Sequence, residues 1–247
     1  MRNLLLRLMY DGTDFHGWQV QPNGITVQEE MQNAVEKILN KRESITGCSR
    51  TDSGVHANDF CCTVRTDSDI DCFKLTGALN AVLPDSISVK SCTDVDFDFH
   101  PRYDCKKKQY LYRVWNINNK NPFLKNYAYH YKNKLDAEFL NKQAKSFIGT
   151  YDFSAFCSSG SSVEDTIRTI YNFSVTRNGD EVDFVVEGNG FLYNMVRIMV
   201  GTLIEISENR IEIDTIKNII ESKDRTNAGR TVPACGLYLN KVYYEEV

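Results

Sequence analysis

The alternation of strand-like and helix-like segments constrains this chain more than any other feature of its sequence. Residues 26–40 place apolar side chains at helical spacing, and Thr26 forms a capping box with Glu29 at their start. Strand-like segments flank this helix, and a second helix ends before Pro84. The predicted order is the ferredoxin-like β-α-β-β-α-β, over residues 2–10, 26–40, 44–48, 59–65, 71–83 and 86–95.

The second half predicts the same order without repeating the sequence. A strand over residues 107–117 precedes a helix over 136–148, for which Gly149 is the expected C-cap. Asn178 and Gly179 mark a hairpin turn between strands over 166–176 and 181–187. Helices over 191–207 and 214–222 and a strand over 237–244 complete this half.

We therefore expect an α+β fold of two ferredoxin-like halves, whose antiparallel sheets merge around a central cleft. The expected domains are residues 1–105 and 106–247. The absence of βαβαβ alternation with phosphate-loop glycines argues against a Rossmann or P-loop enzyme. The chain has no run of about 20 apolar residues and no secretory signal, which predicts a cytoplasmic protein.

Eight cysteines raise the question of metal or disulfide chemistry. None of them forms a C-x-x-C motif, and a site built from His56, Cys61 and Cys62 lacks further ligands at usable spacing. We expect most of the cysteines to be small buried hydrophobic residues, and we expect no metal or cofactor.

Charge is distributed unevenly along the chain. The net charge is −4, yet residues 101–145 carry eleven Lys or Arg against three Asp or Glu, which gives this segment +8 and the remainder −12. Tyr, Trp and Phe side chains alternate with these basic residues. Such a segment is typical of an RNA-binding track, because cations contact phosphates and aromatic rings stack on bases. A solvated, tyrosine-rich face of a sheet explains the same pattern equally well.

The loop Gly47–Ala57 concentrates reactive residue types between two strands. Asp52 is a candidate nucleophile or general base, and Arg50 could hold it ionised or reach the substrate. A surface Asp-Ser-Gly turn is the alternative interpretation. In the second half, Arg197 is surrounded in sequence by apolar residues, so it either extends to solvent or meets a buried carboxylate, for which Asp52 is the candidate.

These residues carry a resemblance to a known family. The resembling segments are, in chain order, Tyr10–Gln19, Val27–Glu29, Arg50–Ala57, Phe99–Arg102, Lys108–Tyr112 and Phe191–Gly201. Over essentially its whole length the chain resembles the TruA family of pseudouridine synthases, and Arg50–Ala57 is the most specific match.

The resemblance implies an isomerase that converts uridine to pseudouridine at positions 38, 39 and 40 of the tRNA anticodon stem-loop. It implies that Asp52 is the catalytic nucleophile, that Tyr110 lies against the uracil, and that Arg197 pairs with Asp52. Arg50 would displace the target base. The expected substrate-binding set is Arg50, Tyr110, Arg102, Lys106, Lys107 and Lys108. A homodimer that binds tRNA in the cytoplasm, without a cofactor, is expected.

Two alternatives remain at this stage. A tRNA-binding or folding factor without catalysis would have the same fold, although the presence of Asp52, Tyr110 and Arg197 argues against it. A thiol- or metal-dependent enzyme that uses the cysteines is the other alternative.

Overall fold

The computed structural model describes residues 1–160 and 163–245, and these form two compact units. The first unit contains Met1–Lys106 and the chain from Tyr238 onward, and the second contains Lys107–Leu237. The last strand therefore groups with the first unit, whereas the sequence placed it in a second domain ending at residue 247. Residues 161–162 and 246–247 of that expected domain lie outside the described part of the chain.

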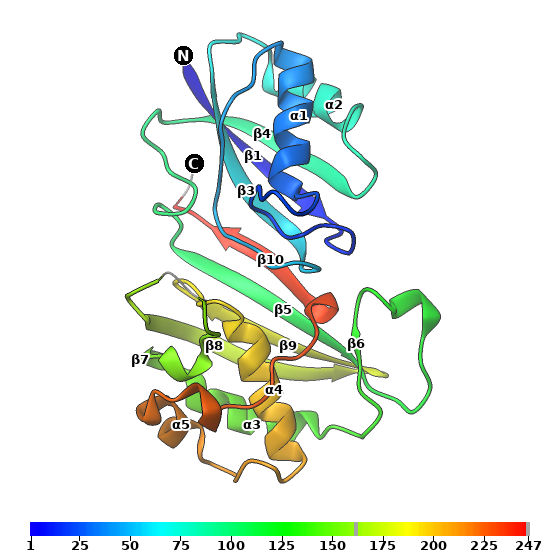
Figure 1. Cartoon of the computed structure of the whole chain (residues 1–247), viewed down its shortest axis with the longest axis vertical. Helices are drawn as coiled ribbons and strands as arrows, with labels where there is room; N and C mark the ends of the chain where they lie inside the picture. The colour runs from blue at the N-terminus through cyan, green and yellow to red at the C-terminus, as the bar shows by residue number, and fades with distance from the viewer. Residues whose placement is uncertain (161–162, 246–247) are drawn as a thin grey trace. The chain divides into compact units, whose positions relative to one another are not determined.

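The first unit contains the expected β-α-β-β-α-β order. Its elements are β1 (Arg2–Tyr10), α1 (Val27–Leu39), β2 (Ile45–Gly47), β3 (His56–Thr66), α2 (Cys72–Asn80), β4 (Ile87–Val95) and, late in the chain, β10 (Leu237–Tyr243). β1 lies between β3 and β4, antiparallel to both. Two short partners share the other edge of β3: β2 pairs antiparallel with its C-terminal half, and β10 pairs parallel with its start. α1 and α2 lie together on one face of this sheet (Figure 1).

The second unit is also α+β, with more elements than the sequence predicted. They are β5 (Lys107–Trp115), β6 (Tyr129–His130), α3 (Ala137–Ala144), β7 (Gly149–Asp152), β8 (Ile167–Asn178), β9 (Glu181–Gly188), α4 (Met195–Ser207) and α5 (Ile216–Ser222), with short 3₁₀ turns between them. β9 lies between β5 and β8, antiparallel to both, and β7 extends the sheet beyond β8. β6 pairs parallel with β5. α3 and α4 cover this sheet (Figure 1).

Sequence signals at helix starts were accurate where a side chain caps the helix. Thr26 accepts a hydrogen bond from the backbone N–H of Glu29 at 3.3 Å, and Asp71 and Asp136 cap α2 and α3 in the same way. The predicted hairpin between β8 and β9 is confirmed, but its turn lies one residue later than expected: Asn178 still pairs with Glu181, and Gly179 and Asp180 form the turn.

Several predicted boundaries were wrong. β3 begins at His56 rather than 59, and α2 ends at Asn80 because the Asn80 side chain bonds both backbone groups of Val89 on β4. Gly149 is not the C-cap of α3. The chain tightens into a 3₁₀ turn after Ala144, and Gly149, at φ 134°, begins β7 instead.

Helix α4 is the most buried helix of the second unit. It begins at Met195 rather than 191, because Asn194 adopts the left-handed conformation (φ 59°) that ends helical geometry on its N-terminal side. Ten of its thirteen residues are buried, and the others are Arg197, Glu205 and Ser207. In the part of the chain that the structure describes, no helix has the length and apolarity needed to span a membrane.

Candidate active site

The loop that carries Asp52 connects β2 to β3 in the first unit. Asp52 is half-buried. The neighbouring segment, residues 10–18, contacts this loop through main-chain atoms: the N–H of Trp18 donates to the carbonyl of Thr51 at 3.1 Å, and the N–H of Gly54 donates to the carbonyl of Phe15 at 3.3 Å. The main chain on both sides of Asp52 is therefore fixed.

Gly17 shows why the N-terminal motif, Tyr10–Gln19, can pack directly against the Asp52 loop. Its φ is +85°, a value that residues with a side chain rarely adopt, and a Cβ there would lie 2.5 Å from the carbonyl oxygen of Thr51. Gly12 approaches the loop as closely, since its Cβ would lie 2.0 Å from the carbonyl oxygen of Val55. Two motifs about 40 residues apart thus form one backbone-to-backbone contact.

Side chains complete the support of this loop. Tyr10 and Thr51 share a hydrogen bond of 2.7 Å between their hydroxyls. His56 is 2% exposed, accepts the N–H of Gly12 at Nδ1 (3.0 Å) and stacks on Tyr238 with ring centroids 4.7 Å apart. His56 therefore serves the packing of the loop. Among residues 1–160 and 163–245, no group of three His, Cys, Asp or Glu residues is placed to hold a metal ion.

Tyr110 lies on β5 in the second unit, opposite Val186 of β9. It is 6% exposed, and its ring meets that of Phe191 edge to face at 5.0 Å. The ring is thus packed by its own unit, which fixes the direction of the hydroxyl group.

Arg197 extends from α4. Its neighbours on the helix are buried apolar side chains that cannot accept hydrogen bonds, so the guanidinium needs acceptors from elsewhere. Its Nε donates to the carbonyl of Val232 at 2.7 Å, and its Nη1 donates to Oδ1 of Asn194 at 2.5 Å. Sequence reasoning missed both partners. An Asn directly before an apolar helix was the available signal for Asn194, whereas no signal pointed to the Val232 carbonyl. The pairing of Arg197 with Asp52, which belongs to the first unit, stays a prediction.

The expected substrate-binding residues fall into two groups. Arg50 and Arg102 are exposed, and so is Lys106, which lies 3.2 Å from Glu245. Lys107 is half-buried and pairs with Glu187 at 2.9 Å, and Lys108 is only 7% exposed.

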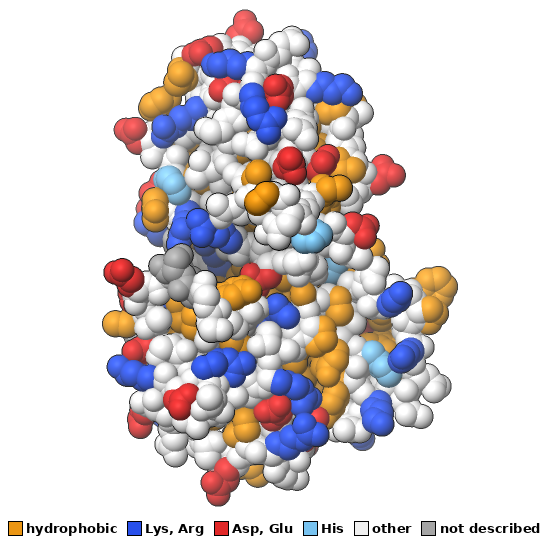
Figure 2. Space-filling model, viewed as in Figure 1, with side chains coloured by type: hydrophobic (Ala, Val, Ile, Leu, Met, Phe, Trp, Pro, Cys, Tyr) orange, Lys and Arg blue, Asp and Glu red, His pale blue; other side chains and the backbone are white. Residues whose placement is uncertain are grey.

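The basic segment, residues 101–145, has one part that fits a solvated sheet face and another that fits an RNA-binding track. Along β5, Arg113 pairs with Glu181 and Asp183 of β9, so this stretch is a charge-balanced sheet face. The loop after β5 is different: Phe123 is 86% exposed, and Lys120 and Lys125 near it are exposed as well. Figure 2 shows hydrophobic and basic side chains side by side over this loop.

The eight cysteines are all free thiols. Cys48, Cys61 and Cys62 are buried, as expected, but the other five are only half-buried, so the expectation that most are buried was wrong. Burial raises the pKa of the Cys61 and Cys62 thiols above the ordinary value. These two thiols are therefore poor nucleophiles near neutral pH.

Comparison with known proteins identifies the family of this chain. The model of a family described as tRNA pseudouridine synthase matches residues 8–104 and 143–245, which include Asp52 and Arg197. Relatives named tRNA pseudouridine synthase A from Thermoanaerobacter sp. (strain X514) and Clostridium acetobutylicum are each 46% identical over 244 residues, 99% of this chain and 100% of theirs. One from Acetivibrio thermocellus is 47% identical over the same coverage.

The sequence and the site thus define a pseudouridine synthase. The chain belongs to the tRNA pseudouridine synthase family, which confirms the resemblance seen in its motifs. A solved structure described as a Cbf5-Nop10-Gar1 complex overlaps 82% of this chain at 12% identity, with a TM-score of 0.37, a likeness too weak to carry an argument.

Proposed function

We propose that this chain isomerises uridine to pseudouridine in tRNA with Asp52 as its nucleophile, and with Tyr110 and Arg197 as further catalytic residues. The chain is an isomerase by family, and it spans the full length of its curated relatives. The observation that carries the assignment of Asp52 is the main-chain support of its loop. A half-buried carboxylate on a fixed loop is suited to attack at a defined atom.

The reaction requires one bond to break and one to form. The bond from uracil N1 to ribose C1′ breaks, the uracil turns, and its C5 bonds to C1′. C5 then loses its proton and N1 takes up a proton, so the product is an isomer of the substrate. An ionised Asp52 can add to C1′ or start elimination across the sugar, and a cationic Arg197 would favour the ionised form. The Tyr110 hydroxyl would assist removal of the C5 proton.

The target base must leave its stack before Asp52 can reach it. Unstacking costs a few kcal/mol, which basic and aromatic contacts offset. We assign displacement of the base to Arg50 and phosphate contacts to Arg102 and Lys106, which are exposed. Lys107 and Lys108 are weaker candidates, because one is paired with Glu187 and the other is buried.

The finer assignments complete the proposal. They are uridines 38, 39 and 40 of the anticodon stem-loop as targets, a homodimer as the active form, and the cytoplasm as its location. Action at three neighbouring positions fits recognition of RNA by shape rather than by base edges.

Release of tritium from tRNA labelled at uracil C5 tests the proposed function. Asp52→Asn should fold normally and lower the rate of release at least about a thousandfold, because the amide is neither a nucleophile nor a base. Asp14→Asn is the matched control, since Asp14 is exposed on the neighbouring segment, and it should release tritium at the wild-type rate.

The same experiment addresses the alternative of a silent tRNA-binding factor. That alternative predicts tight tRNA binding without tritium release from the wild-type protein. Substantial turnover by Asp52→Asn would instead remove Asp52 from the mechanism.

A further inference from the structure

The chain after α5 lies against α4 with main-chain atoms in direct contact. We call residues 228–233 the strap. A Cβ on Gly201 of α4 would lie 1.8 Å from the carbonyl oxygen of Arg230, and the N–H of Gly229 donates to Oγ1 of Thr202 at 2.9 Å. The backbones of the strap and the helix thus leave no room for a side chain at Gly201, so a shift of the strap changes the contacts of the residues on this face of the helix.

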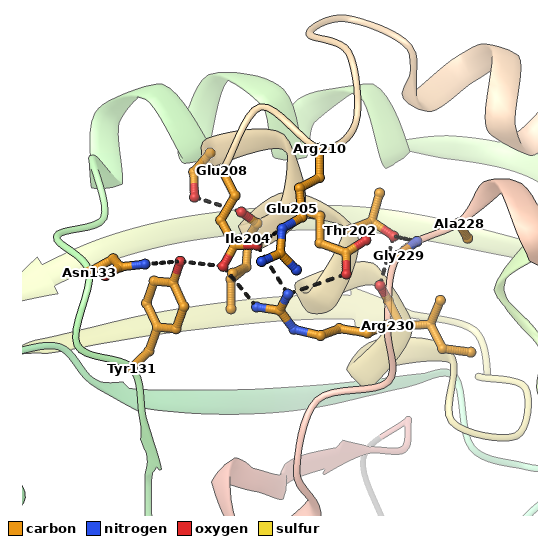
Figure 3. Close-up of polar contacts among 12 residues, drawn as sticks. Tyr131, Asn133, Thr202, Ile204, Glu205, Glu208, Arg210, Ala228, Gly229 and Arg230 are labelled. Carbon is orange, nitrogen blue, oxygen red and sulfur yellow. Dashed lines mark hydrogen bonds and ion pairs between the residues drawn. The ribbon is translucent and has the colours of Figure 1, made fainter.

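An ion-pair cluster fastens the strap to the C-terminal end of α4. The guanidinium of Arg230 reaches both oxygens of Glu208 at 3.1 Å and one oxygen of Glu205 at 3.3 Å (Figure 3). Tyr131 donates to Glu208 at 2.6 Å from the other side. Charge-assisted bonds of this kind are about twice as strong as neutral ones, and these carboxylates are at most 16% exposed.

Two residues further along, the strap meets Arg197. The carbonyl of Val232 accepts the Nε hydrogen of Arg197 at 2.7 Å, and the N–H of Val232 donates to the backbone carbonyl of Arg197. The next carbonyl, that of Pro233, accepts the hydroxyl of Tyr112 at 2.8 Å. The strap therefore carries the acceptor that orients the Arg197 side chain.

Arg197, Gly201, Glu205 and Glu208 follow one another at intervals of four, four and three residues, so they share one face of the helix and its end. The strap runs along this face of α4. The side chain of Arg230 is bound to Glu205 and Glu208 at the C-terminal end of the face, and the carbonyl of Val232 meets Arg197 near its N-terminal end. We infer that Arg230 is a positioning residue for the isomerisation: through Glu205 and Glu208 it fixes the strap, and the strap orients the guanidinium of Arg197. This inference rests on the proposed role of Arg197.

The test compares two arginines that share Glu208. Arg230→Met removes the anchor of the strap and should lower kcat for tritium release about tenfold, with KM for tRNA changed less than twofold, because a guanidinium is misdirected rather than a binding surface lost. Arg230→Lys keeps one ion pair and should stay within about threefold of wild type. Arg210→Met removes another partner of Glu208, at 3.1 Å, but lies outside the strap and should leave kcat within twofold.

A second readout follows the geometry without activity. NMR spectra of protein labelled with ¹⁵N-arginine show the Nε–H signals of the arginine side chains. The signal of Arg197 is assigned as the one that is missing in Arg197→Lys. Its hydrogen exchange should become at least tenfold faster in Arg230→Met and stay unchanged in Arg210→Met. If thermal melting shows that Arg230→Met does not fold, Arg230→Lys takes its place, with an intermediate exchange rate expected.

The outcomes separate the inference from the proposed function. Faster exchange of the Arg197 Nε–H together with a lower kcat in Arg230→Met supports both the inference and the proposed role of Arg197. Faster exchange with unchanged kcat leaves the orientation of Arg197 by the strap intact and removes Arg197 from the reaction. Unchanged exchange in Arg230→Met, or an equal loss of kcat in Arg210→Met, overturns the inference.

Discussion

Asp52 is supported by main-chain contacts to the 10–18 segment. Arg197 is instead oriented by the amide side chain of Asn194 and by the carbonyl of Val232, which lies on a strap fastened by ion pairs. Both are residues of the proposed reaction, and each is held by its own unit. The two kinds of support have different sensitivities. A main-chain contact tolerates many side-chain changes but no added atom between the backbones, while an ion-pair cluster responds to pH and to loss of a single charge.

The strongest test of the main-chain contact between residues 10–18 and the Asp52 loop adds one methyl group. Gly17→Ala should destabilise the protein by about 3 kcal/mol, because Ala is strained at positive φ and its Cβ would meet the carbonyl oxygen of Thr51. The Asp52 loop should shift with it, so tritium release should fall more than stability alone explains. Urea unfolding and turnover of the folded fraction measure the two effects.

Gly77→Ala is the matched control for Gly17→Ala. Gly77 lies in α2, and a Cβ there meets nothing within 4 Å. Ala should raise stability by about 0.5–1 kcal/mol, because it is the better helix former, with activity unchanged. Equal stability of the two variants would contradict the backbone contact at Gly17.

The ion-pair cluster that fastens the strap should depend on pH. Hydrogen bonds from Arg230, together with that from Tyr131, hold the pKa of Glu208 below the usual value of 4.5. The folded protein thus binds fewer protons at this group than the unfolded chain does, so the contribution of Glu208 is present above about pH 4.5 and is lost as the pH falls through the lowered pKa.

Glu208→Gln measures this contribution. At pH 7 the variant should be less stable than wild type by about 1–2 kcal/mol, and the difference should shrink steadily below pH 4.5 in urea unfolding. Glu212→Gln, at an exposed carboxylate nearby, should stay within about 0.5 kcal/mol of wild type throughout. A difference for Glu208→Gln that does not change with pH would show that shape, not charge, fastens the strap.

The smallest effect is expected where a side chain only assists a main-chain contact. Tyr10→Phe leaves the hydroxyl of Thr51, which is 7% exposed, without this partner and should cost about 1 kcal/mol. Turnover should fall less than threefold, because the main-chain bonds of the Asp52 loop remain. A tenfold loss of kcat would mean that side chains hold Asp52 as well, and the contrast with Arg197 would weaken.

Local signals predicted most of the fold. Polar caps such as Thr26 and Asp136 fixed the starts of helices because the bonds they accept come from N–H groups two or three residues away. Boundaries failed where a distant partner decided them, as for Asn80, whose side chain serves β4, and Gly149, which begins β7. The grouping of β10 with the first unit also depends on pairing with β3, more than 170 residues earlier in the chain.

For the site, the sequence by itself supplied the candidate residues, because Asp52, Tyr110 and Arg197 stand in motifs that resemble those of the family. It also marked Arg197 as a charge in need of partners. Only the tertiary structure decided what those partners are and which basic residues remain exposed. The carbonyl of Val232 and the carboxylates of Glu187 and Glu208 come to their arginine or lysine through folding, and a backbone carbonyl has no signature in a sequence, since every residue has one.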